Sequence, residues 1–156
     1  MVYLFIKTEN LVILHMVYLE TWIALGSLGL SIMFAALMVS FYFFLMGPNG
    51  KGPQIVSDPV GLLIQIISIS GAPSLILAGI VPGLVRTNKK TVHTSIILVC
   101  IGIIMITGMI TVTTIIPKIN EQYLFQGIRV VPYIFIIGGA GILVVGSYLL
   151  ARSRRI

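Results

Sequence analysis

Four long apolar stretches, each about the length of a membrane crossing, set the main constraint on this chain of 156 residues. A helix needs roughly 20 predominantly apolar residues to cross the hydrocarbon of a bilayer. Charged residues are only 9% of the chain, against about a quarter in soluble domains. They gather near positions 7–20, 51–58, 86–90, 118–129 and 152–155. The sequence therefore predicts an all-α, polytopic integral membrane protein that forms a bundle of four transmembrane helices.

Turn-forming and capping residues mark the ends of the predicted helices. Gly47 and Pro48 stop the first helix, and Pro117 stops the third. Asp58 can cap the second helix, and Pro59 suits its first position because the N–H that proline lacks would have no partner there. We interpret residues 1–156 as a single transmembrane domain. Its predicted spans are approximately 21–46, 59–85, 91–116 and 130–151.

The segment before the first span is also apolar, from Leu11 to Leu19. One helix from Leu11 to Met46 would be about 54 Å long at 1.5 Å per residue, which exceeds the thickness of a bilayer. Two alternatives follow. Either the first helix is tilted and protrudes, or residues 1–18 form an extra N-terminal helix that lies at the membrane interface.

The second predicted helix combines proline with polar residues. Pro73 and Pro82 each remove a backbone donor and crowd the preceding turn, so we expect a kinked helix. Gln65 and Ser68 share one face of it. Transporters use broken, polar-faced helices to bind substrate. In the alternative interpretation, Gln65 bonds to a neighbouring helix and the serines satisfy carbonyls that proline leaves without a donor.

Two features predict how the helices pack. The connection at 86–90 is short, so we expect the second and third helices to lie side by side and antiparallel. Helices in lipid associate by close packing, which favours small residues at their contacts. These contacts are expected either inside the bundle or with a helix of another protein. The small residues in such positions are Ser27, Ser31, Ala35, Gly79, Gly83, Gly138 and Gly141.

The distribution of lysine and arginine predicts the orientation in the cell membrane. Cytoplasmic loops carry the excess of basic residues. Three basic residues, Lys51, Lys118 and Arg129, lie in the connections expected on one side. The other side has seven, which are Lys7, Arg86, Lys89, Lys90, Arg152, Arg154 and Arg155. The N- and C-termini of this multi-pass chain are therefore expected in the cytoplasm.

Residues that could support chemistry are few. His15, Glu20 and His93 fall near the predicted cytoplasmic surface and are the candidates for a metal site, but two histidines without ligand spacing do not define one. The sequence shows no motif for a cofactor or for catalysis. The net charge of +6 comes from basic residues that flank apolar spans. That placement is typical of membrane anchoring and not of nucleic-acid binding.

Three hypotheses for function follow. The first is a non-catalytic accessory or structural subunit of a larger membrane protein complex, for example a respiratory or membrane monooxygenase assembly, with the lipid bilayer and other integral membrane subunits as its partners. The second is a small oligomeric transporter or channel that uses the kinked second helix. The third is a metal enzyme based on His15, Glu20 and His93. The abundance of isoleucine and the short loops are typical of a prokaryotic protein.

Overall fold

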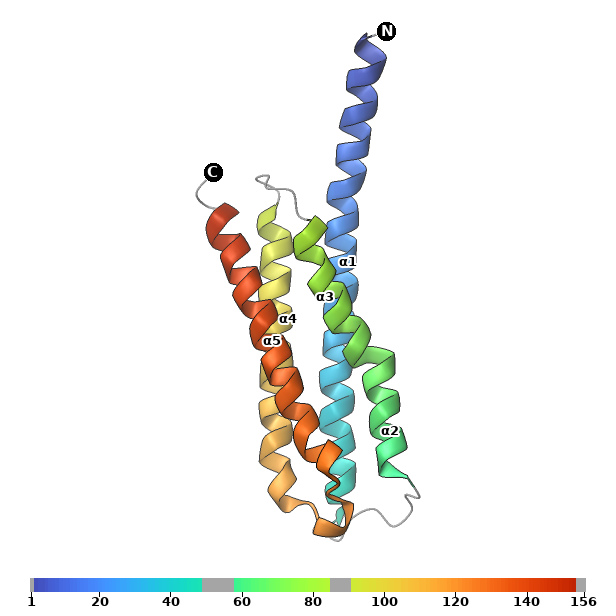
Figure 1. Cartoon of the computed structure of the whole chain (residues 1–156), viewed down its shortest axis with the longest axis vertical. Coiled ribbons are helices and arrows are strands. Elements are labelled where there is room, and N and C mark those ends of the chain that lie inside the picture. The colour runs from blue at the N-terminus through green and yellow to red at the C-terminus, as the bar shows by residue number, and fades with distance from the viewer. Residues whose placement is uncertain (1, 49–57, 85–90, 154–156) are drawn as a thin grey trace.

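A computed structural model describes residues 2–48, 58–84 and 91–153, and the side chains of 19–48, 58–84 and 92–153. Every regular element in these ranges is helical (Figure 1). In chain order they are α1 (Val2–Met46), α2 (Pro59–Ile66), the π turn η2 (Ile67–Gly71), α3 (Ala72–Leu84), α4 (Thr91–Ile115), the 3-10 turns η3 (Ile116–Lys118) and η4 (Glu121–Tyr123), and α5 (Gln126–Ser153).

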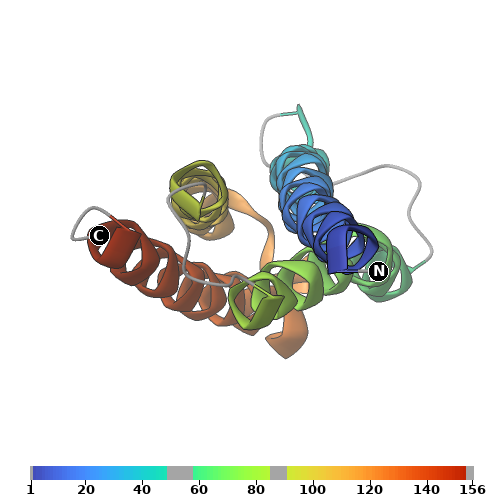
Figure 2. The ribbon, with the colours of Figure 1, turned by 90° about the horizontal axis from the view of Figure 1, so that it is seen from above.

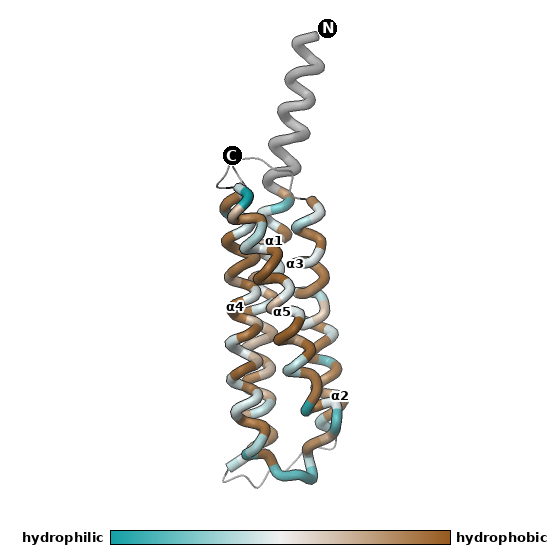
Figure 3. Tube along the Cα trace, turned by 60° about the vertical axis from the view of Figure 1, so that its left-hand side comes forward, coloured by the Kyte–Doolittle hydropathy of each residue, from teal (hydrophilic) through white to brown (hydrophobic). Residues whose placement is uncertain are grey.

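Four helical segments of the described chain are long and apolar enough to cross a membrane. The second of them is made of α2, η2 and α3 together. Apolar residues run along the helices, whereas hydrophilic residues gather in the connection between α4 and α5 (Figure 3). The prediction of an all-α bundle of four transmembrane helices is therefore confirmed. The four segments are Leu19–Met46, Pro59–Leu84, Val92–Lys118 and Gln126–Ser153.

The first helix is continuous over its 45 residues, from Val2 to Met46. Its N-terminal part extends beyond the ends of the other helices (Figure 1). At 1.5 Å per residue the helix is about 68 Å long, roughly twice the hydrocarbon thickness of a bilayer. Of the two alternatives for the N-terminus, the structure has the protruding helix and not a separate interfacial one.

The helices do not pack in the order in which they follow one another. In the described residues α4 lies against α5 and α1, whereas α3 lies mainly against α1, so α3 and α4 are diagonal neighbours (Figure 2). The prediction that the second and third helices lie side by side is wrong. Neighbouring helix axes are about 8–10 Å apart, and a connection over 85–90 can reach about 20 Å when extended. It is therefore long enough to cross a diagonal.

The beginning of α1, the end of α3, the beginning of α4 and the end of α5 lie at one end of the bundle, which we name the terminal end (Figure 1). The connection between α4 and α5 lies at the opposite end. Between the two ends, the core contains fully buried side chains such as Met38, Leu98 and Met105. The outer surface is also apolar, with Ile137 and Val144 72% and 64% exposed. Such a surface suits contact with lipid.

Candidate functional site

The second membrane segment begins with a capped helix, α2, and bends at a π turn just before Pro73. The carboxylate of Asp58 accepts a hydrogen bond from the Gly61 N–H (2.9 Å) and caps α2. Further along, Pro73 has no N–H to donate to the carbonyl four residues back. Just before it, the chain forms a π turn in which the Ala72 N–H donates to the carbonyl of Ile67, five residues back. The direction changes between α2 and α3 (Figure 1), whereas Pro82 lies within α3 without ending it.

Three buried serines join α3 to α1 immediately after this bend. Ser27 Oγ donates to the Ser74 carbonyl (2.9 Å). The hydroxyls of Ser31 and Ser74 share a hydrogen bond of 2.6 Å, and the one that does not donate in it donates to the Ser27 carbonyl, which lies 2.8 Å from Ser31 Oγ and 3.2 Å from Ser74 Oγ. Among the described residues, no buried side-chain nitrogen or oxygen lacks a partner. These serines therefore bond the helices to each other.

Close to the midpoint of the same segment, Gly71 lies against two aromatic rings. A Cβ atom at Gly71 would be 2.7 Å from Phe34 Cε2 and 2.9 Å from Phe135 Cζ. The two rings come from α1 and α5, with centroids 4.3 Å apart and planes tilted by 42°. The absence of a side chain at Gly71 therefore lets the bent segment approach this pair closely, so that three helices meet at one level.

The polar face predicted for the second helix is turned outward. The side chains of Gln65 and Ser68 are both exposed on the surface of the bundle. The polar groups of this segment that face the interior are instead Ser70 and Ser74, which are fully buried. Ser70 Oγ donates to the carbonyl of Ile66 in its own helix (2.9 Å). A pathway along Gln65 and Ser68 would therefore run outside a single copy of the chain.

The residues predicted to pack the helices divide into two groups. In the first group, Ser27 and Ser31 belong to the serine cluster. Ala35 packs closely against Gly108: a Cβ added at Gly108 would lie 2.8 Å from the Cβ of Ala35. A Cβ at Gly138 would be 3.2 Å from Leu75 Cδ2. The others lie in the open, because an added Cβ would meet nothing within 4 Å at Gly79, Gly83 and Gly141.

Another close contact between two helices involves Gly102, Gly139 and Gly146, which are not in the set named above as packing residues. A Cβ at Gly102 would lie 2.7 Å from Leu143 Cβ and 2.8 Å from the Gly139 carbonyl oxygen. One at Gly146 would lie 3.0 Å from the backbone nitrogen of Val99. Gly139 and Gly146 are seven residues apart, two turns along one face of α5. A search for that spacing could have found them.

Tyr42 makes a contact that sequence reasoning also missed. Its side chain is fully buried in α1, and its hydroxyl donates to the carbonyl of Ile128 (2.5 Å). In a regular helix that carbonyl would bond to the N–H four residues on, at position 132, which is a proline. The tyrosine hydroxyl thus takes the place of the missing backbone donor.

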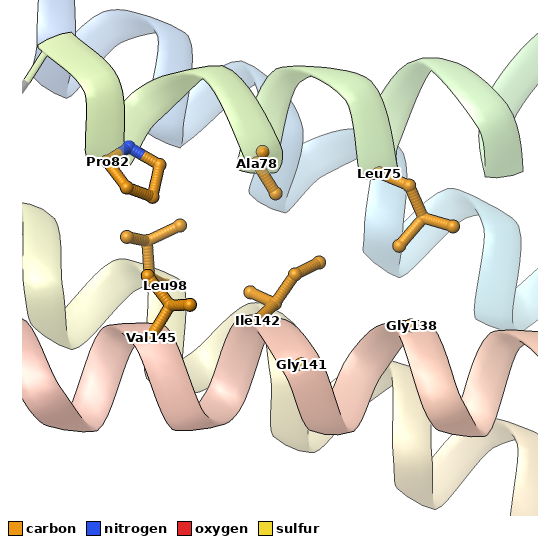
Figure 4. Close-up of a pocket in the computed structure, with 9 residues that line it drawn as sticks. Leu75, Ala78, Pro82, Leu98, Gly138, Gly141, Ile142 and Val145 are labelled. Atoms are coloured by element: carbon orange, nitrogen blue, oxygen red, sulfur yellow. The ribbon is translucent and has the colours of Figure 1, made fainter.

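An apolar groove lies between α3 and α5, with α4 at its base (Figure 4). It has a volume of about 480 Å³. Ala78 and Pro82 approach it from α3, and Ile142 and Val145 from α5, with Leu98 below. Gly79 and Gly141, which an added Cβ would not crowd, are among its lining residues. The groove faces the membrane and is formed entirely by apolar side chains and glycine.

Of the three candidate metal ligands, the structure describes the side chains of Glu20 and His93. Glu20 is buried, with 8% of its surface exposed, and His93 is exposed. The side chain of His15 lies outside the described residues. Within the described ranges, no group of three histidine, cysteine or acidic residues is placed to hold a metal ion.

No protein-family model, curated protein or solved structure matches the chain. The interpretation of function therefore depends on the bent helix, its outward polar face and the groove beside it.

Proposed function

We propose that this chain is a non-catalytic accessory or structural subunit of a larger membrane protein complex, such as a respiratory or membrane monooxygenase assembly. The observation that supports this proposal is the outward position of Gln65 and Ser68 on the bent helix. Gln65 is six residues after Pro59, about 9 Å along the helix axis. Its amide is therefore presented on the outer surface within the membrane segment.

The energetics favour a protein partner at this face. An amide in hydrocarbon without a hydrogen-bond partner costs about 2–7 kcal/mol. Glutamine and serine side chains in membrane helices recover part of that cost by hydrogen bonding to another helix. The buried serines of this chain already bond to one another and to the backbone. Gln65 and Ser68 are the polar groups of the bent segment that remain available to a second protein.

The test is native mass spectrometry of the tagged protein after gentle extraction from its own membrane. We expect a heteromeric assembly of fixed stoichiometry. The variant Gln65→Leu should release the chain from that assembly, whereas Gln65→Asn, which keeps the amide, should retain a measurable share of it. Wild-type chain recovered alone, without stoichiometric partners, would contradict the proposal.

The second candidate function is a small oligomeric transporter or channel. The π turn and the bend beside Pro73 favour it, because interrupted helices are common at transporter binding sites. With Gln65 and Ser68 turned outward, the pathway would form between copies of the chain. Transport in reconstituted vesicles should then fall in the Gln65→Leu variant. Unchanged transport would count against this candidate.

We also propose that the protein resides in the cell membrane with its terminal end in the cytoplasm. The support is the excess of lysine and arginine, seven against three, in the segments expected on that side.

A further inference from the structure

The groove runs between α3 and α5, along the two helices. At one end of its lining, Gly138 lies beside Leu75: a Cβ added at Gly138 would be 3.2 Å from Leu75 Cδ2. From there its lining residues continue along both helices to Pro82 and Val145, toward the terminal end of the bundle (Figure 4). Its volume of about 480 Å³ lies within the roughly 300–1,000 Å³ of ligand sites.

A positive charge follows the groove on the same face of α5. The α5 residues that line the groove are Gly138, Gly141, Ile142 and Val145. Arg152 comes seven residues after Val145, which places it on the same side of the helix and about 10.5 Å nearer the terminal end. Its side chain is exposed. The apolar groove therefore leads toward the guanidinium group of Arg152, near the level where lipid headgroups lie.

This combination matches one kind of molecule better than the others available in a membrane. A phospholipid has a hydrocarbon chain that lies parallel to the helices and a phosphate at the interface. Basic residues beside clefts between transmembrane helices bind anionic headgroups. A partner's helix would fill the groove but would need an acidic residue placed at its end to pair with Arg152, whereas an anionic phospholipid always carries its phosphate at that level.

We propose that the groove between α3 and α5 binds one hydrocarbon chain of an anionic phospholipid, with the lipid phosphate paired to Arg152. The site lies between α3 and α5, whereas Gln65 is on α2, so lipid binding and partner binding can be lost separately. The site therefore does not depend on the proposed subunit function.

The glycines of α3 provide a matched pair of variants. Gly79 lines the groove, so a side chain added there enters it, whereas Gly83, one turn further along α3, is not among the lining residues. Neither position has a heavy atom within 4 Å of an added Cβ. Gly79→Leu should therefore fill the groove, and Gly83→Leu is its control. Gly141→Leu fills the same groove from α5 and serves if Gly79→Leu does not fold.

The experiment is native mass spectrometry of delipidated protein titrated with phosphatidylglycerol or phosphatidylcholine in detergent. Wild-type protein and Gly83→Leu should retain one phosphatidylglycerol at least five-fold more tightly than phosphatidylcholine. Gly79→Leu should lose the retained lipid. Arg152→Gln should bind both lipids equally, at the phosphatidylcholine level.

Two results would overturn the proposal. One is equal retention of the two lipids by wild-type protein, which would leave only general contact with hydrocarbon. The other is unchanged lipid retention in a folded groove-filling variant. A groove-filling variant that keeps its lipid and instead loses a protein partner would assign the groove to a helix.

Discussion

At the scale of single residues, the structure shows how a buried backbone group that loses its own donor can be satisfied by another helix. Pro132 leaves the Ile128 carbonyl without an N–H four residues on, and the hydroxyl of Tyr42 bonds to it from α1. This contact could not be predicted from the sequence, because nothing local to Tyr42 or Pro132 says that α1 and α5 meet there. The position of Pro132 shows which carbonyl lacks its helical donor, but only the fold shows that the donor is the hydroxyl of Tyr42.

We predict that Tyr42→Phe destabilises the protein by about 1–3 kcal/mol, the cost of leaving a buried carbonyl without a partner. In a Pro132→Ala background the backbone N–H of residue 132 can bond to Ile128 instead, so the same substitution should cost much less. Unfolding titrations of the two single variants, the double variant and the wild type give the coupling free energy. Equal costs in both backgrounds would show that the two residues act independently.

At the scale of helices, the contacts between elements depend on which small residues face a neighbour. The number of spans and the kink in the second helix could be predicted from the sequence, because the spans follow from the length of the apolar stretches and the kink follows from Pro73. It did not distinguish Gly102 and Gly139, which are in tight contact, from Gly79 and Gly83, which are open. Apolar residues surround all these helices, so hydrophobicity does not mark the inner face. The diagonal placement of α3 and α4 does not follow from the sequence either, because a connection as long as 85–90 can reach an adjacent or a diagonal helix.

We predict opposite effects for two alanine substitutions. In Gly102→Ala, the added Cβ would lie 2.8 Å from the Gly139 carbonyl oxygen and 2.9 Å from the Leu143 nitrogen. Since backbone atoms cannot move aside, α4 and α5 must separate, at a cost of about 1–3 kcal/mol. Gly83→Ala meets nothing within 4 Å and should be neutral or stabilising by up to about 1 kcal/mol, from helix propensity.

The free energy of unfolding in mixed micelles measures both variants against wild-type protein. A Gly102→Ala protein as stable as Gly83→Ala would mean that α4 and α5 are not in tight contact at this level. Loss of stability in Gly83→Ala alone would place a partner or a further contact on the outer face of α3.

At the scale of the whole molecule, the two ends of the bundle differ in charge. In the sequence, seven of the ten lysine and arginine residues fall before Leu19, between α3 and α4, or from Arg152 onward. The groove leads toward the terminal end, with Arg152 beyond it. The opposite end has the polar connection of η3 and η4, with Glu121 and Gln122 exposed. The charge count was sufficient to predict an orientation, but not the groove, which needs two helices from different parts of the chain.

The last prediction concerns that orientation. In a Cys100→Ala background, which removes the one cysteine, a new cysteine at Ser153 reports on the terminal end and one at Gln122 on the opposite end. With the terminal end in the cytoplasm, a membrane-impermeant maleimide added to intact cells should label Gln122→Cys at once. It should label Ser153→Cys only after permeabilisation, because the charged reagent cannot cross the bilayer. The reverse pattern would place the basic end outside and remove the support that the charge count gives to a cytoplasmic location. Equal labelling of both positions in intact cells would mean that the chain inserts in two orientations, as expected if the excess of four basic residues is too small to decide its topology.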